Sequence, residues 1–265
     1  MCPRLFTIGT FSVPTYGVLV ALGFVIGLYL VGRLAPRSGL NTDDMTNLAV
    51  YVGLAAILGA KAFMVLSNLG YYLDNPGQFF SLSTLQAGGV FYGGLLAALA
   101  VAAWYANKAN LPALAAADVL APSVAVGHSI GRLGCFAAGC CWGQPTSLPW
   151  GVMFTDPTAH DSVGVPLGIH LHPTQLYEAA GTFAVAIVLL KLFRKPHAPG
   201  TILGWYFVLY SSFRFAIEFL RDHSPQSFPF DGPLSSTQWV ALLLIAAGAY
   251  LLTRQKGSPA AQPAS

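Results

Sequence analysis

Long apolar stretches recur seven times along this chain of 265 residues, separated by shorter polar connections. A helix needs roughly 20 mostly apolar residues to cross the hydrocarbon core of a bilayer, and each stretch approaches that length. The pattern therefore predicts an all-α polytopic membrane protein. We expect its seven transmembrane helices at residues 13–32, 47–66, 89–106, 113–131, 174–193, 200–220 and 235–252.

The longest connection, residues 142–173, lies between the fourth and fifth predicted spans. Its prolines and glycines predict irregular coil with a short hairpin, and loops of this length are usually functional. The small polar residues at 257–265 predict a disordered tail. We therefore expect one transmembrane domain over residues 1–256, with the loop as an insert between spans four and five.

Composition supports the membrane assignment and excludes other classes of protein. Hydrophobic residues make up 55% of the chain and charged residues 9%, whereas soluble domains carry about a quarter charged residues. A mean hydropathy of +0.60 excludes a disordered chain. The net charge of +3 is scattered along the sequence. Since no basic run is present, we expect no nucleic-acid partner.

Positive charges divide unequally between the two sides that seven spans define. Cytoplasmic loops of membrane proteins carry an excess of Lys and Arg. We therefore expect a multi-pass protein with the N-terminus outside, the loop 142–173 outside and the C-terminus in the cytoplasm. The predicted cytoplasmic side holds Arg33, Arg37, Lys108, Lys191, Arg194, Lys195, Arg254 and Lys256, and the outer side holds Arg4, Arg132 and Arg221.

The outer end of the fourth span carries the sequence HSIGRLGCFAAGCCWG, which begins at His128. Arg132 in this segment suits a phosphate group, because a guanidinium binds phosphate oxygens bidentately. Gly131 and Gly134 would allow a ligand to approach the backbone closely. Alternatively, Arg132 extends to the membrane interface and the glycines pack against other helices.

Three thiols, those of Cys135, Cys140 and Cys141, lie in the same segment. Zinc binding is one possibility, but the spacing differs from that of the usual structural zinc sites, and we expect no metal there. The thiols could instead form a disulfide on an oxidising outer face, or simply pack or contact a ligand.

Two further clusters place titratable residues at the ends of spans. HLHPTQLYEA begins span five and contains His172 and Glu178, although an ordinary helix start explains it equally well. YSSFRFAIEFLR begins at Tyr210 and contains Arg214 and Glu218, which share a helix face. Intramembrane charges are costly unless they are paired or face a cavity. This second cluster is therefore a functional candidate, or else a self-contained packing pair.

Together these motifs resemble the bacterial prolipoprotein diacylglyceryl transferase family along nearly the whole chain. That family moves a diacylglyceryl group from phosphatidylglycerol to the lipobox cysteine of a prolipoprotein signal peptide and releases glycerol phosphate. The resemblance implies a catalytic domain in the bacterial inner membrane that acts in lipoprotein maturation without a cofactor. The motifs that carry it are Tyr16–Gly17, Tyr92–Gly94, Gly131–Gly134, the specific HPTQLYEA at His172–Ala179, and Phe213–Arg221.

The resemblance also implies roles for individual residues. Arg132 would bind the phospholipid head group, Arg214 would stabilise the departing phosphate, and Glu218 would hold Arg214 in place. The implied catalytic residues are Arg214, Tyr210, Tyr16 and His172, and the implied substrate-binding residues are Arg132, Tyr92, Gly93, Gly94, Gly131, Gly134, Cys135 and Glu218.

The chain departs from the family signature in two of these motifs. Cys135, Ala138 and Cys140 replace two asparagines and a glutamate, and Tyr92 replaces a histidine. A paralogue with another acceptor, and a non-enzymatic membrane transporter or lipid-binding protein, are the competing functions. The general base is open among His172, Tyr92, Tyr16 and His128.

Overall fold

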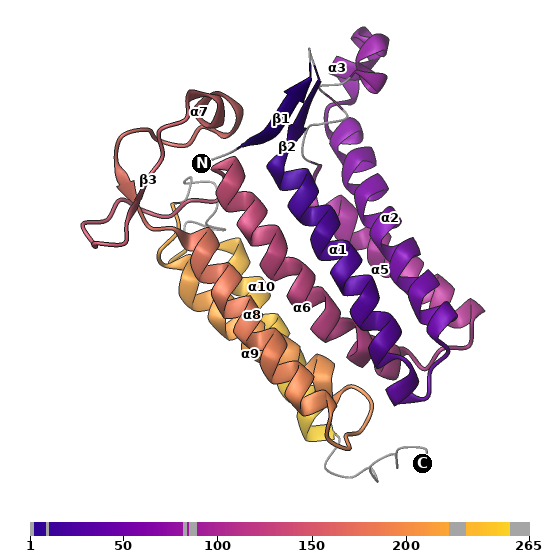
Figure 1. The fold of residues 1–265 in the computed structure, drawn as a ribbon. Coiled ribbons are helices and arrows are strands. Elements are labelled where there is room, and N and C mark those ends of the chain that lie inside the picture. Colours follow the sequence, from indigo (N-terminus) through magenta and orange to yellow (C-terminus); the bar gives the residue numbers. More distant parts are fainter. Residues whose placement is uncertain (1–2, 9–10, 82–83, 85–88, 223–231, 255–265) are drawn as a thin grey trace. The chain divides into compact units, whose positions relative to one another are not determined.

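The computed structural model describes residues 3–8, 11–81, 84, 89–222 and 232–254, which are mostly helical (Figure 1). The predicted tail at 257–265 lies outside them. The helices are α1 (Thr15–Leu34), α2 (Thr42–Ser67), α3 (Leu69–Asp74), α5 (Phe91–Lys108), α6 (Ala113–Ala138), α7 (Pro157–Val163), α8 (Thr174–Phe193), α9 (Thr201–Glu218) and α10 (Ser236–Arg254). Short 3-10 turns are η1 (Pro36–Ser38) and η2 (Pro76–Phe80), and the strands are β1 (Arg4–Ile8), β2 (Phe11–Pro14), β3 (Val152–Met153) and β4 (His170–Leu171).

Each predicted span coincides with a helix of 18 residues or more. Within the described part of the chain, five helices are long and apolar enough to cross a membrane: α1, α2, α6, α8 and α10. The other two are more polar, because α5 ends in WYANK and α9 contains Arg214 and Glu218. The prediction of a helical membrane protein is confirmed, whereas seven crossings stay a prediction.

The described residues form two compact units, one over 31–116 and the other over the remainder. In the 31–116 unit, α2 packs against α5 at glycine positions. A Cβ added at Gly93 would collide with the Cβ of Phe63, and one at Gly94 would lie 2.7 Å from the carbonyl oxygen of Ala56. These contacts favour helix packing for both glycines, and their role in substrate binding stays a prediction.

In the other unit, α1 lies close to α6, and α9 packs between α8 and α10 (Figure 1). A Cβ at Gly23 would lie 2.8 Å from the carbonyl oxygen of Gly127, so α1 and α6 approach backbone to backbone. The ring of Phe213 on α9 occupies the space above Gly181 on α8. Small residues that permit such close approach are typical of helix contacts within membranes.

Asp118, one of the charges inside a predicted span, has a structural role in this unit. Its buried carboxylate accepts hydrogen bonds from the backbone N–H groups of Gly200 at 2.6 Å and Leu203 at 2.8 Å. Gly200 is the N-cap residue of α9 and Leu203 lies in its first turn, where backbone N–H groups have no partner within the helix. Asp118 on α6 therefore caps α9.

The long loop contains one unpredicted helix and a two-stranded antiparallel pair, whose strands are separated by residues 154–169 rather than joined in the predicted short hairpin. β3 and β4 pair in antiparallel register, with Val152 opposite Leu171. Between them, α7 begins after Asp156, whose Oδ1 accepts a hydrogen bond from the N–H of Thr158 at 2.8 Å. The loop has its own small core of buried residues, which are Phe154, Ala159, Val165 and Leu171. The insert is thus a folded cap rather than irregular coil.

Candidate functional site

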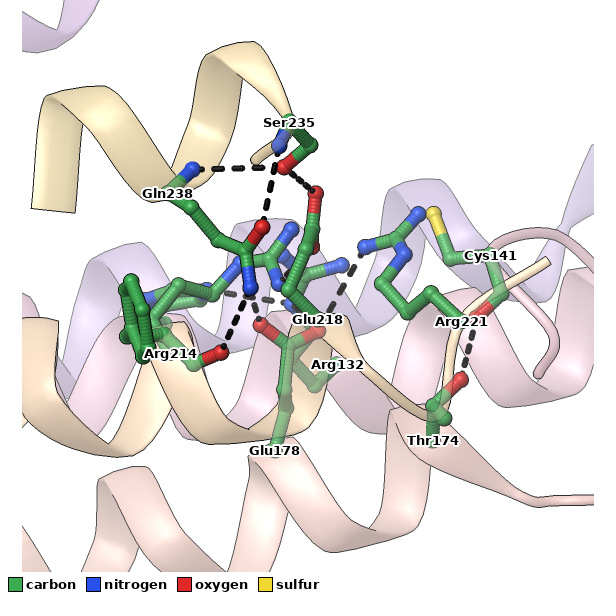
Figure 2. Close-up of polar contacts among 11 residues, drawn as sticks. Arg132, Cys141, Thr174, Glu178, Arg214, Glu218, Arg221, Ser235 and Gln238 are labelled. Carbon is green, nitrogen blue, oxygen red and sulfur yellow. Dashed lines mark hydrogen bonds and ion pairs between the residues drawn. The ribbon is translucent and has the colours of Figure 1, made fainter. Parts of the chain in front are cut away.

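Three arginines from two helices and the segment after α9 converge on one carboxylate. Glu178, on the second turn of α8, has a fully buried side chain. Its Oε2 lies 3.1 Å from Nε of Arg132 and 3.9 Å from Nη1 of Arg221, and its Oε1 lies 3.2 Å from Nε of Arg214 (Figure 2). The three arginine side chains are only 11–18% exposed. Segments up to 89 residues apart in sequence, from Arg132 to Arg221, therefore meet at one point.

A second carboxylate, Glu218, extends this cluster toward the start of α10. It pairs with Arg214 one helical turn away and accepts a hydrogen bond from Oγ of Ser235 at 2.8 Å (Figure 2). The side-chain oxygen of Gln238 accepts from the backbone N–H of Ser235 at 2.9 Å, which fixes this turn. Three positive charges against two negative ones leave a net positive cluster. Arginines in such a cluster suit one anionic phosphate group.

His128 and Tyr210 lie beside Arg132. Nε of Arg132 donates a hydrogen bond to Nε2 of His128 at 3.1 Å. The imidazole ring stands edge-to-face against Tyr210, with ring centroids 5.2 Å apart, and Tyr210 stacks on Tyr206. A nitrogen that accepts a hydrogen bond carries a lone pair and no proton, so His128 is neutral here. Because that lone pair is engaged, His128 is poorly placed to take a proton from a substrate.

Gly134 on α6 supports the beginning of α1. A Cβ added at Gly134 would lie 3.2 Å from Cδ2 and 3.3 Å from Cα of Tyr16, so the glycine provides the surface on which Tyr16 rests. A Cβ added at Gly131 would have no neighbouring atom within 4 Å. Tyr16 is 44% exposed. The structure therefore brings Tyr16 to the end of α6 that carries Arg132.

His172 lies in the loop segment that leads into α8. Its Nδ1 is 3.3 Å from the hydroxyl of Tyr177, which accepts a hydrogen bond from Nε1 of Trp150 at 2.8 Å. Its backbone carbonyl accepts a hydrogen bond from the N–H of Gly143 at 3.0 Å. The backbone of Gly143 also pairs with that of Arg221 in an isolated antiparallel β-bridge. His172 thus belongs to the aromatic and backbone framework next to the arginine cluster.

The three cysteines of this region are free thiols and lie together at the end of α6. Their Sγ atoms are all within 4.8 Å of one another. The spacing of these cysteines along the sequence differs from that of the usual structural zinc sites, but the fold still brings their three sulfurs into a compact group. The members of this thiol group are Cys135, Cys140 and Cys141.

The predicted site residues fall into three sets. Arg132 and Arg214, predicted to act on one head group, share Glu178, and the predicted pair of Arg214 with Glu218 is present. Tyr210, Tyr16, His172, Gly131, Gly134 and Cys135 lie in the same unit, whereas Tyr92, Gly93 and Gly94 belong to the 31–116 unit at the start of α5. Sequence reasoning missed Glu178 as the common partner, and it placed Arg221 in the Phe213–Arg221 motif and on the outer side without giving it a role in the site. The signal for Glu178 was its place in the specific HPTQLYEA motif.

Comparisons with known proteins add an independent observation. A family model described as "Prolipoprotein diacylglyceryl transferase" matches residues 3–254. A phosphatidylglycerol–prolipoprotein diacylglyceryl transferase of Clostridium tetani is 34% identical over 251 residues, which cover 95% of this chain and 96% of that protein. Proteins of the same name from Photobacterium profundum and Aliivibrio fischeri are 34% and 35% identical over 254 residues. These alignments cover 94% of this chain and 91% and 88% of the relatives.

Proposed function

This chain belongs to the prolipoprotein diacylglyceryl transferase family, and on that premise we propose that it transfers the diacylglyceryl group of phosphatidylglycerol to the lipobox cysteine of prolipoproteins. Glycerol phosphate is the other product. The observation that carries the proposal is the convergence of Arg132, Arg214 and Arg221 on the buried carboxylate of Glu178. A shared carboxylate holds the guanidinium groups within reach of one phosphate.

In the proposed reaction the acceptor sulfur attacks a glycerol carbon of the lipid. The sulfur–carbon bond forms while the carbon–oxygen bond to the phosphate breaks, and the electron pair leaves with glycerol phosphate. Preorganised cations that face developing negative charge lower the barrier of such a step. Arg132 binds the phosphate of the head group, and Arg214 neutralises charge on the departing oxygen. Glu178 and Glu218 position these two side chains.

The thiol of the acceptor must also lose its proton. With the lone pair of His128 engaged by Arg132, the candidates for the base are His172, Tyr16 and Tyr92. A substitution of the true base removes the ionisation of that base from the pH profile of the transfer rate. His172→Asn, Tyr16→Phe and Tyr92→Phe, measured across pH, therefore identify it.

We further propose that all seven long helices cross the bacterial inner membrane, as one catalytic domain over 1–256 with the N-terminus periplasmic and the C-terminus cytoplasmic. Helix lengths of 18–26 residues and the excess of Lys and Arg on one side support this topology. Impermeant thiol labelling of cells tests it in a cysteine-free background. Leu148→Cys should be labelled in intact cells, and Ser38→Cys only after the membrane is opened.

The transfer assay combines the purified full-length chain, phosphatidylglycerol vesicles and a lipobox peptide. Both lipidated peptide and glycerol phosphate are measured. Arg132→Ala and Arg214→Ala should each reduce the rate by about 100-fold or more, as expected for lost transition-state charge stabilisation. Arg194→Ala, which removes an exposed arginine after α8, is the matched control and should keep the parent rate.

The possible outcomes are distinct in this assay. Release of glycerol phosphate without lipidated peptide would indicate a paralogue with another acceptor. Absence of both products, with solute flux in proteoliposomes, would indicate a transporter and contradict the proposal. Full activity of either arginine variant would contradict the assigned roles.

A further inference from the structure

The thiol group of Cys135, Cys140 and Cys141 has the dimensions of a metal-binding site. Thiolates bound to Zn²⁺ at about 2.3 Å in tetrahedral geometry lie about 3.8 Å from one another. The three Sγ atoms are already within 4.8 Å of one another. Movements of about an ångström or less therefore bring all three sulfurs onto a single cation.

The backbone of the turn after α6 is held in an unusual conformation. Gly139 and Cys141 both have left-handed backbone angles, with φ of 77° and 60°. A left-handed conformation is uncommon for a residue other than glycine and persists where the surroundings impose it. Here Oγ1 of Thr174 donates to the carbonyl of Cys141 at 2.8 Å, and Nε2 of Gln175 donates to the carbonyl of Cys140 at 2.6 Å. Both donors come from fully buried residues, so the turn is built into the helix packing.

Metals bind the thiolate form of cysteine, which carries a negative charge, and the guanidinium groups of Arg132 and Arg221 supply positive charge near the sulfur of Cys141. Arg221 lies beside the sulfur of Cys141 (Figure 2). Three thiolates and one divalent cation carry a net charge of −1, which the neighbouring guanidinium groups balance.

We propose that Cys135, Cys140 and Cys141 bind one metal cation of the class that prefers sulfur, represented by Zn²⁺. Thiolate ligands select Zn²⁺ and Cu⁺ over Mg²⁺ and Ca²⁺, which prefer oxygen. Among the described residues, the group contains no further His, Cys, Asp or Glu. The site thus has three protein ligands and one position for water or an external thiol, the arrangement of an open rather than a closed zinc site. The proposal stands independently of the transferase function.

The test uses the purified full-length chain in detergent, reduced and stripped of metal. Co²⁺ alone is titrated in first, because cobalt bound to thiolates gives a strong sulfur-to-metal charge-transfer absorption, and Zn²⁺ is then added to displace it. We expect one Co²⁺ per chain and complete displacement by Zn²⁺. Serine variants of the three cysteines should each weaken binding by about tenfold or more. Cys2→Ser is the matched control and should bind like the parent.

Two results would overturn the proposal. The first is the absence of a charge-transfer absorption in the parent chain, a result that needs no variant and so does not depend on how the variants fold. The second is protein purified without reductant in which two of the three thiols form a disulfide and no metal is present. Loss of binding in the Cys2→Ser control equal to that in the other variants would also contradict the assignment.

Discussion

The shared carboxylate of Glu178 leads to the sharpest prediction, because Glu178→Gln keeps the shape of the side chain and removes its charge. The three arginines that it holds are then left with Glu218 as the one remaining carboxylate of the described cluster. We expect a large loss of stability together with a loss of transfer activity.

The magnitude follows from the geometry. At an effective dielectric constant of about 20, a charge pair at the 3.1–3.2 Å separations of Glu178 from Arg132 and Arg214 is worth about 5 kcal/mol of Coulomb attraction. Much of this attraction offsets the cost of burying the ions. Removal of one partner of a buried pair typically costs about 3–5 kcal/mol, because the other charge is left uncompensated.

Thermal unfolding in detergent, followed by tryptophan fluorescence, measures this cost. A loss of about 3–5 kcal/mol corresponds to a decrease of roughly 10 °C in the midpoint for a chain of this size. Asp43→Asn, an acid-to-amide change at an exposed position at the start of α2, is the matched control and should shift the midpoint by little. A midpoint for Glu178→Gln equal to that of the parent would refute the account of Glu178 as the common partner of the arginines.

Other predictions concern the helix contacts, the thiols and the cap of α9. Gly134→Ala should lower the thermal midpoint because the added Cβ meets the backbone of α1, whereas Gly131→Ala on the same helix should leave it unchanged or raise it slightly. In metal-free reduced protein at about pH 6, iodoacetamide should alkylate Cys141 and spare Cys140. The groups around the two thiols lower the pKa of Cys141 and raise the pKa of Cys140. Mass spectrometry that finds both thiols equally unreactive would contradict this prediction. Asp118→Asn should destabilise the protein by about 1–2 kcal/mol through loss of a charged cap, measured by the same thermal scan.

The helices could be predicted from the sequence because long apolar stretches require burial in a bilayer or a protein core. The predicted range 174–193 coincides with α8, whereas α6 extends seven residues beyond its predicted end at 131. The extension begins with Arg132, and a charged residue at this place in an apolar stretch is normally taken as the end of a membrane span. The contact of Gly134 with Tyr16 on α1 and the ion pair of Arg132 with Glu178 on α8 hold this part of α6, and a hydropathy pattern contains no information about such contacts.

The candidate site was predictable in its residue types and not in its connections. Intramembrane charge identified Arg214 and Glu218, whose spacing on one helix also predicted their pairing. The partnership of Glu178 with three arginines depends on helices that are distant in sequence, so local spacing could not show it. The sequence does indicate where α7 begins, because Asp156 is a typical N-cap residue and Pro157 is typical of a first helical turn. The buried cluster against which α7 packs forms only when the whole loop folds, so local sequence could not show it.

The central claim is that Arg132 and Arg214 act on the same phosphate. A double-mutant cycle with Arg132→Lys and Arg214→Lys tests it, because lysine keeps the charge and loses the bidentate geometry. The measured quantity is kcat/KM for transfer to the lipobox peptide. Residues that act on one group are coupled, so the double variant should be less impaired than the product of the single effects, with a coupling of about 1 kcal/mol or more. Effects that multiply independently would contradict the claim.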